Sequence, residues 1–399
     1  MKTRLIAILL LSYFSTNLVA QWVHTTCPAG GAVQCLVADG TTILAGTQTG
    51  GIYLSVDNGL NWIAANNGLT NTNVLSLAKS GANIFAGTNG GGVFLSTNNG
   101  ASWTAVNNGI TSMAVWSLAI SGTTIFAGTG NNGGVFISTN NGSSWAAANN
   151  GLFCFIVWSL AVNGPDVYAA TDWGGVFITT NNANSWTAIN TGLPNQDVKS
   201  IAVSGTNLFA AVNNGGVYLS TNGGGSWTLA NTGIGNNYPT SLLVHGTAIF
   251  AGTINNEFAT NTNGSNWFSL GTPTLDIWSQ AMNSTDMFLG TYNAGVWMRS
   301  LNNIYSGVNE FSAGASKISI SPNPFSVSAT LKIETELEVK NAELVIYDVR
   351  GKEVRRMENV SGKEIVINRD DLEDGIYLFY LWQDGVGVGT GRLVVVGKE

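Results

Sequence analysis

The stretch IFAGTNGGGVFLSTNNGASWTAVNNG, from Ile84 to Gly109, decides the fold because close copies of it recur along the chain. Its centre is the pattern SxNxGxxW, formed by Ser96, Asn98, Gly100 and Trp103. The tryptophans of successive copies are 41, 42, 41, 41 and 40 residues apart. A fixed period of this length indicates an array of identical supersecondary units. The third and last positions of the six copies are Asp57 and Trp62, Asn98 and Trp103, Asn140 and Trp145, Asn181 and Trp186, Asn222 and Trp227, and Thr262 and Trp267.

Each unit contains four short apolar segments separated by turn residues. In the unit that starts at Val115, these segments are residues 116–120, 124–128, 135–138 and 144–148. They are rich in β-branched and aromatic residues and too short for helices, so they predict strands. No useful helical period occurs between Gln21 and Gly307. Four antiparallel strands in about 41 residues describe one blade of a β-propeller, which places this part of the chain in the all-β class.

The number of blades follows from the innermost strand, in which a small residue precedes Leu or Ile, or Gln280 in the last unit. This position occurs seven times, at Cys35, Ser76, Ser117, Ser159, Ser200, Ser241 and Ser279. The seventh unit ends after Ser300 without a tryptophan motif, whereas Trp22 lies before the first inner strand. We therefore expect residues 21–24 to supply the outer strand of the last blade and to close a seven-bladed ring, which removes exposed sheet edges.

The turn motif has a physical explanation. An Asn or Asp side chain can accept a hydrogen bond from the backbone N–H two residues on, and glycine supplies a positive φ. The indole is then expected to cover the turn as an apolar lid. We interpret the motifs as structural staples of the blades.

These motifs resemble the Asp-box, or BNR repeat, of sialidases, xyloglucan-cleaving propellers, sortilin-type receptors and photosystem II assembly factors. The resemblance covers six of the seven units and implies a propeller fold. This chain has Asn or Thr262 where the family usually has Asp, and only Asp57 matches strictly. The departure argues against the motifs as calcium sites or catalytic carboxylates.

Composition divides the chain into four segments. Residues 1–20 have a basic start, an apolar run and a terminal Ala20, which predicts a secretory signal peptide. Residues 21–308 form the predicted propeller, residues 309–316 a linker and residues 317–399 a charged C-terminal domain. The propeller segment contains only the basic residues Lys79, Lys199 and Arg299, so nucleic acid and anionic membranes are unsuitable partners.

The C-terminal segment alternates in the manner of strands and predicts a small Ig-like β-sandwich. Its landmarks are SPNPF (321–325), LVIYDVRGKEV (344–354), LEDGIYLFYL (372–381) and GRLVVV (391–396). In this order they resemble the type A C-terminal sorting domain of type IX secretion substrates in Bacteroidetes-type bacteria. The resemblance implies interaction with that secretion machinery and export, via the periplasm, to the outer cell surface or the medium. Removal of the domain after export, and anchoring or release of the protein, stay open.

Cofactor and metal motifs are missing from the sequence. No nucleotide-binding loop or metal-ligand spacing occurs, and His24 and His245 are too scattered for a zinc site. We therefore expect no cofactor and no metal. Cys27 and Cys35 could pair and leave Cys154 free, but we favour Cys35 as a buried small residue of an inner strand.

Catalytic groups are sparse. A sialidase binds a carboxylate with three arginines, and the propeller contains only Arg299, so that activity is disfavoured. A glycoside hydrolase needs two carboxylates. The acids expected on the face formed by the loops between second and third strands and between blades come from different blades and follow no recognised pair pattern: Asp172, Asp197, Glu257 and Asp276.

Aromatic residues on the same face suggest ligand binding instead. The candidate binding residues are Trp173, Asp172, Tyr238, Tyr292 and Phe155. We expect Trp116, Trp158 and Trp278 to pack between blades. The sequence therefore favours a secreted or surface-bound, non-enzymatic propeller that binds a glycan or a protein, with a polysaccharide hydrolase as the alternative. Ligand identity and oligomeric state are not determined by the sequence.

Overall fold

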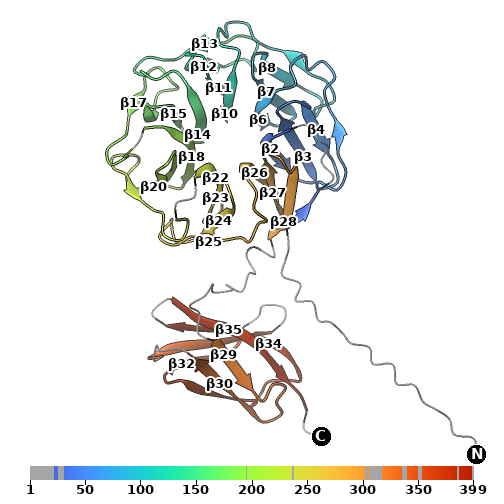
Figure 1. The fold of residues 1–399 in the computed structure, drawn as a ribbon, viewed down its shortest axis with the longest axis vertical. Helices are drawn as coiled ribbons and strands as arrows, with labels where there is room; N and C mark the ends of the chain where they lie inside the picture. Colours follow the sequence, from blue (N-terminus) through green and yellow to red (C-terminus); the bar gives the residue numbers. More distant parts are fainter. Residues whose placement is uncertain are drawn as a thin grey trace, which may run out of the picture. The chain divides into compact units, whose positions relative to one another are not determined.

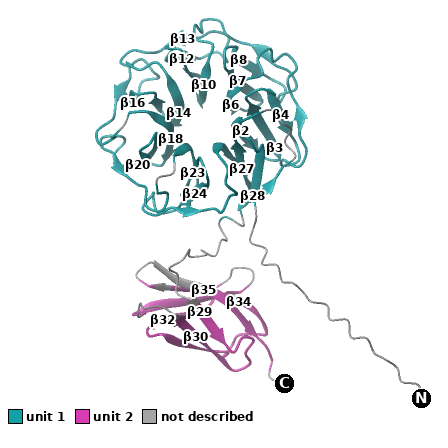
Figure 2. Ribbon diagram, viewed as in Figure 1, with its two compact units in different colours: residues 1–305 teal, residues 306–399 magenta. Residues whose placement is uncertain are grey.

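The computed structural model describes residues 22–25, 31–194, 196–235, 238–301, 304, 317–334, 339–348, 353–383 and 386–397. The chain divides into two compact units, residues 1–305 and 306–399 (Figure 2). Strands dominate both units. The predicted signal peptide lies outside the described residues.

Unit 1 is a β-propeller. Its described residues form seven four-stranded antiparallel sheets around a common axis, with the first strand of each sheet nearest the centre (Figure 1). This arrangement confirms the predicted seven-bladed fold. We number the sheets as blades 1 to 7 in chain order of their inner strands.

The strand limits repeat closely from blade to blade. Blades 1 to 3 consist of β2 (Val33–Asp39), β3 (Thr42–Thr47), β4 (Ile52–Ser55) and β5 (Ile63–Ala64); β6 (Val74–Ser80), β7 (Asn83–Thr88), β8 (Gly92–Ser96) and β9 (Thr104–Ala105); β10 (Val115–Ser121), β11 (Thr124–Thr129), β12 (Val135–Ser138) and β13 (Ala146–Ala147). Blades 4 and 5 consist of β14 (Val157–Asn163), β15 (Asp166–Thr171), β16 (Gly175–Thr179) and β17 (Thr187–Ala188); β18 (Val198–Ser204), β19 (Asn207–Val212), β20 (Gly216–Ser220) and β21 (Thr228–Leu229). Blades 6 and 7 consist of β22 (Pro239–His245), β23 (Ala248–Thr253), β24 (Glu257–Thr260) and β25 (Phe268–Ser269); β26 (Ile277–Met282), β27 (Asp286–Thr291), β28 (Val296–Ser300) and β1 (Val23–His24).

The second strand of each blade is almost continuously buried because neighbouring blades cover both of its faces. In β7, for example, all residues from Ile84 to Thr88 are buried. A strand covered on both faces is an apolar run rather than an alternating one. The outer strands are shorter than expected: residues 144–148 were predicted to form a strand, and β13 contains only Ala146 and Ala147.

The N-terminal strand closes the ring as predicted. Strand β1 pairs with β28, with Val23 opposite Met298 and His24 opposite Trp297. A second contact joins the innermost strands of blades 7 and 1, where Ser279 Oγ donates to the carbonyl oxygen of Val33 at 3.0 Å. The ring is therefore closed at both its inner and its outer circumference.

The small residues of the inner strands, which gave the blade count, lie at contacts between blades. Ser76 Oγ donates to the Val115 carbonyl of the next blade at 3.1 Å. Cys35 is a free thiol directed at the Val74 carbonyl, with Sγ and O 3.9 Å apart. The other cysteine of the hypothetical pair, Cys27, lies outside the described residues.

The turn motif stabilises the blades in a different way from the one expected. Ser96 Oγ accepts from the backbone N–H of Gly100 at 2.8 Å, and Asn98 Oδ1 accepts from that of Ser102 at 2.9 Å, so each acceptor serves a residue four positions on. The Trp103 ring lies beside Gly100 of its own turn, and its indole N–H donates to the Ala65 carbonyl of the preceding blade at 2.8 Å. The motif thus joins neighbouring blades as well as closing a turn.

Unit 2 is a β-sandwich, as expected from its alternating segments. One sheet has the order β29-β30-β33 and the other the order β32-β31-β34-β35. A shared core between the sheets includes Leu331, Ile367, Leu344, Phe379 and Leu393. Strand β32 is rich in charged residues, and its side chains are exposed or half-buried. The limits are β29 (Lys317–Ser321), β30 (Ser328–Glu334), β31 (Ala342–Asp348), β32 (Glu353–Val360), β33 (Glu364–Asn368), β34 (Gly375–Gln383) and β35 (Val386–Val395).

Candidate functional site

Two sets of loops form one face of the propeller, which we call the loop face. It comprises the loops between second and third strands and the connections between blades. Backbone hydrogen bonds join the two sets: Asp172 N donates to Ile156 O at 3.0 Å, and Tyr292 N donates to Asp276 O at 3.0 Å. The candidate residues from both sets are therefore held on the same side of the ring.

Trp173 is the most unusual side chain of the loop face. It is 69% exposed and its φ is +62°. The equivalent positions of other blades are occupied by Gly90, Asn132 and Asn214, residue types that tolerate a positive φ. A bulky side chain in this conformation is strained, and such strain is concentrated at functional sites.

The Trp173 loop is joined to a second aromatic segment of blade 4. Cys154 Sγ donates to the Asp172 carbonyl at 2.5 Å. The adjacent Phe153 is 65% exposed and makes an edge contact with Phe177, at a ring-centroid distance of 4.8 Å. Phe155 is also exposed. The bonds from Cys154 to Asp172 and from Asp172 to Ile156 therefore join the Trp173 loop to the segment that contains Phe155.

Blades 6 and 7 carry another aromatic group on the loop face. Trp278 stacks on Tyr292, with ring centroids 5.0 Å apart and planes inclined by 28°. Trp278 is 40% exposed and its partner lies in its own blade, so the expectation that it packs between blades was wrong. Tyr238, in the connection that enters blade 6, is exposed as well.

Every inner strand of the propeller contains a register shift at its second residue. Such β-bulges re-aim a side chain and are frequent beside functional sites. We call these seven positions the bulge ring: Gln34, Leu75, Trp116, Trp158, Lys199, Thr240 and Trp278. Because the inner strands lie nearest the axis in Figure 1, the bulge ring surrounds the axis at the loop face.

Three neighbouring members of the bulge ring form a continuous row. Trp116 and Trp158 make an edge contact between blades 3 and 4, with centroids 4.7 Å apart, as expected. The Nζ atom of Lys199 lies 4.2 Å from the centroid of the Trp158 ring. Lys199 Nζ also forms a 2.9 Å ion pair with Asp197 Oδ1, and Asn213 Nδ2 donates to Asp197 Oδ2 at 2.8 Å.

Sequence reasoning did not find the role of Lys199. One sequence feature could have indicated it. Lys199 directly precedes the small residue Ser200 of an inner strand, and the three tryptophans of the bulge ring occupy the same position in their own strands. The bulge at which these side chains lie leaves no mark in the residue pattern itself.

The four candidate carboxylates are in different environments. Glu257 begins β24 and is fully buried, in a position that is Val or Ile in the other six blades. Burial raises the pKa of its carboxyl well above the ordinary value. Asp197 is 3% exposed and ion-paired with Lys199, whereas Asp172 and Asp276 are half-buried on the loop face.

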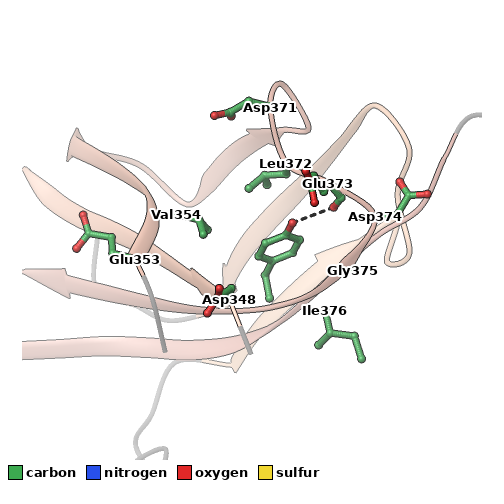
Figure 3. Close-up of a pocket in the computed structure, with 10 residues that line it drawn as sticks. Asp348, Glu353, Val354, Asp371, Leu372, Glu373, Asp374, Gly375 and Ile376 are labelled. Atoms are coloured by element: carbon green, nitrogen blue, oxygen red, sulfur yellow. Dashed lines mark hydrogen bonds between the residues drawn. The ribbon is translucent and has the colours of Figure 1, made fainter. Parts of the chain in front are cut away.

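A hollow of about 630 Å³ lies in unit 2 (Figure 3). Tyr377 is one of its lining residues and donates through its hydroxyl to the Glu373 carbonyl at 2.9 Å. Five of its lining residues are acidic, yet no group of three or more His, Cys, Asp or Glu side chains among the described residues could hold a metal ion. The lining residues are Asp348, Glu353, Val354, Asp371, Leu372, Glu373, Asp374, Gly375, Ile376 and Tyr377.

Comparison with known proteins supports both units. Residues 319–395 match the family described as the secretion system C-terminal sorting domain. No curated protein matches the chain significantly. Among solved structures, the chain is similar to PorZ, a surface component of the type IX secretion system of Porphyromonas gingivalis, with 14% identity, a TM-score of 0.57 and coverage of 92% of this chain and 60% of PorZ.

Two further solved structures share the propeller fold. YCF48 bound to D1 peptide has 12% identity and a TM-score of 0.57, over 70% of this chain and 96% of YCF48. An ancestral GH74 enzyme has 18% identity and a TM-score of 0.55, over 95% of this chain and 64% of the enzyme. At these identities the likeness establishes the fold alone.

Fold and family match define the class of the protein: a β-propeller with a C-terminal sorting domain of the type IX secretion system. The sorting domain marks the protein for export to the cell surface or the medium. In the part of the chain that the structure describes, none of the helices has the length and apolarity needed to span a membrane.

Proposed function

We propose that this protein is an exported β-propeller that binds a glycan or a protein partner through its loop face. The binding residues are Trp173, Asp172, Tyr238, Tyr292 and Phe155. The observation that carries the proposal is Trp173, which combines a positive φ with 69% exposure. A residue that is strained and exposed contributes little to folding, so we assign to its ring the role of contacting a ligand.

The surrounding surface supports this assignment. Phe155, Tyr238 and Tyr292 are exposed on the same face, where half-buried Asp172 and Asp276 supply polar groups. Aromatic area with a few fixed polar groups is the usual composition of a binding site. The rest of the ring is held by hydrogen bonds between blades, so the loops rest on a rigid scaffold.

The alternative is a glycoside hydrolase that uses two of the four candidate carboxylates. A pair of accessible carboxylates roughly 5 to 10 Å apart is required. Glu257 is fully buried and Asp197 is engaged by Lys199, which leaves Asp172 and Asp276 as the residues such a mechanism would use. The structural likeness to a GH74 enzyme is one of fold and adds no catalytic residues.

The test is a binding screen with the exported chain, residues 21–399, against a glycan array and against extracellular proteins in a pulldown. The variant Trp173→Ala should lose binding, whereas Phe268→Ala should not. Phe268 is a suitable control because it is an exposed aromatic residue on the outer strand β25, away from the loop face. Hydrolysis of a bound polysaccharide that stops in Asp172→Asn would instead favour the enzyme.

A further inference from the structure

Lys199 differs from an ordinary surface lysine because its charge is already compensated inside the fold. Its ammonium contacts the Asp197 carboxylate at 2.9 Å and the face of Trp158 at 4.2 Å, and its side chain retains 31% exposure. An ammonium has three N–H donors. The ion pair fixes the group in place and still leaves donor capacity toward the solvent.

The compensated charge determines which ligand atoms suit this donor. A carboxylate or sulfate ligand would have to compete with Asp197, and it would also face Asp172 and Asp276. Lys199 is the only Lys or Arg that the described residues place on the loop face, because Lys79 pairs with Asp39 at the opposite ends of the inner strands and Arg299 lies on β28, bonded to the Leu270 carbonyl. Charge complementarity therefore disfavours an anionic ligand.

On one side of Lys199 the next members of the bulge ring are aromatic, whereas Thr240 follows on the other side. Trp116 and Trp158 extend the row on one side, and Trp278 presents a 40% exposed ring stacked on Tyr292 elsewhere around the axis. Alternating apolar faces and hydroxyl groups are the chemistry of a sugar ring. An uncharged sugar ring can stack on an indole through its apolar face and accept a hydrogen bond from an ammonium through a hydroxyl oxygen.

Resting on the proposed binding function, we infer that the ligand is an uncharged saccharide, and that Lys199 donates a hydrogen bond to one of its hydroxyl oxygens while Trp278 supports a sugar ring. The bulge ring then forms the part of the site nearest the axis. The loop-face aromatics, including Trp173, bind further units of the same chain.

The inference can be tested by calorimetric titration of the exported chain with neutral oligosaccharides (cello-, xylo- and mannohexaose) and with alginate and polygalacturonate as anionic probes. Wild-type protein should bind a neutral probe with an affinity that changes less than about twofold between ~0.05 and ~0.5 M NaCl, since an uncharged ligand is not screened. Lys199→Met should weaken binding at least about tenfold, which corresponds to the loss of one hydrogen bond to a charged donor.

Matched variants separate binding from folding. Lys79→Met removes the other described Lys–Asp pair of the propeller and should leave binding unchanged. Lys199→Met leaves Asp197 buried without its cation, so the double variant Lys199→Met with Asp197→Asn keeps the test valid if the single variant unfolds. Trp278→Ala should lower the affinity independently, because it removes an exposed ring without breaking the ion pair.

Each other outcome has a distinct meaning. Binding of anionic saccharides alone, or of a protein alone, overturns the uncharged ligand and leaves the proposed binding function intact. Binding of a neutral saccharide that Lys199→Met and Trp278→Ala do not weaken overturns the role of the bulge ring. Absence of any ligand in this titration and in the screen above overturns both the inference and the proposed function.

Discussion

The indole N–H of Trp22 donates to the carbonyl oxygen of Leu270, 248 residues further along the chain, at 3.1 Å. This contact reproduces at the closure the bond that Trp103 makes with Ala65 in the preceding blade. The residue is buried, whereas Trp62 is half-exposed and donates to Gly59 of its own turn at 3.0 Å. Of the tryptophans in blades 7 and 1, Trp22 therefore joins two blades, whereas Trp62 stabilises its own turn.

Trp22→Ala should destabilise the propeller by about 3–5 kcal/mol, the usual cost of removing a buried tryptophan. Trp62→Ala is the matched control and should cost less than half of that, because its ring is partly solvated and makes no bond to another blade. The measurement is the urea-induced unfolding of both variants. Equal losses would show that the closure does not depend on the indole of the N-terminal segment.

Glu257 should make stability depend on pH. The folded state keeps the carboxyl protonated above its ordinary pKa of 4.5, because burial raises the pKa. The free energy of unfolding should therefore decline as pH rises above about 4.5, until the raised pKa of the folded state is passed. Glu257→Gln should remove this slope, measured as unfolding midpoints between pH 4 and pH 9.

Gln280, which contacts Glu257, allows a second test of the buried carboxyl group. Gln280 Nε2 lies 3.3 Å from the Glu257 carboxylate, at a position that is Leu or Ile in the other blades. The double substitution Glu257→Val with Gln280→Leu restores the apolar contact of those blades. It should stabilise the protein at pH 8, because replacing a buried polar pair by apolar side chains is often favourable. Lower stability would indicate that the pair contributes to the contact between blades 6 and 7.

The side chain of Asn107 should contribute more to the stability of the propeller than that of Asn108. Its Oδ1 accepts from Val93 N at 2.7 Å and its Nδ2 donates to Gly91 O at 2.9 Å, so it satisfies two backbone groups of β8 and its preceding loop. Asn107→Ala should cost about 1–3 kcal/mol, because the buried N–H loses its acceptor. Asn108→Ala is the control: its side chain is exposed, and Trp145 uses only its backbone carbonyl.

Substitution of Trp173 should raise the stability of the fold and remove ligand binding. Trp173→Asn places at this φ a residue that blades 3 and 5 already use, and should stabilise the fold by about 1 kcal/mol. Trp173→Ala removes the ring but keeps an unfavourable φ, so it should stabilise less. Both variants should lose ligand binding. Retained binding in either would contradict the assigned role of the ring.

Removal of residues 317–399 should abolish export. In a bacterium with a type IX secretion system, the truncated chain should accumulate in the periplasm, as detected by cell fractionation and immunoblotting. The full chain should appear on the surface or in the medium. Surface display of the truncated protein would show that residues 319–395, despite their family match, are not the export signal.

The architecture of the propeller could be predicted from the amino-acid pattern alone. Each blade is built from interactions within about 41 residues, so a repeated pattern of turn residues and apolar runs is sufficient to predict both the blade and the number of copies. The closing strand was also predictable, because the seventh unit lacks an outer segment that only Trp22 and its neighbours could supply. The sorting domain was legible from its ordered landmarks.

The contacts between side chains of different blades depend on the folded arrangement and could not be read from the repeat. Trp116, Trp158 and Lys199 are about 41 residues apart and approach one another because each lies on a β-bulge of a different blade. The ion pair with Asp197, the burial of Glu257 and the strained φ of Trp173 depend in the same way on neighbouring strands. A repeat fixes what every blade has in common, whereas the candidate site is made of the positions at which individual blades differ.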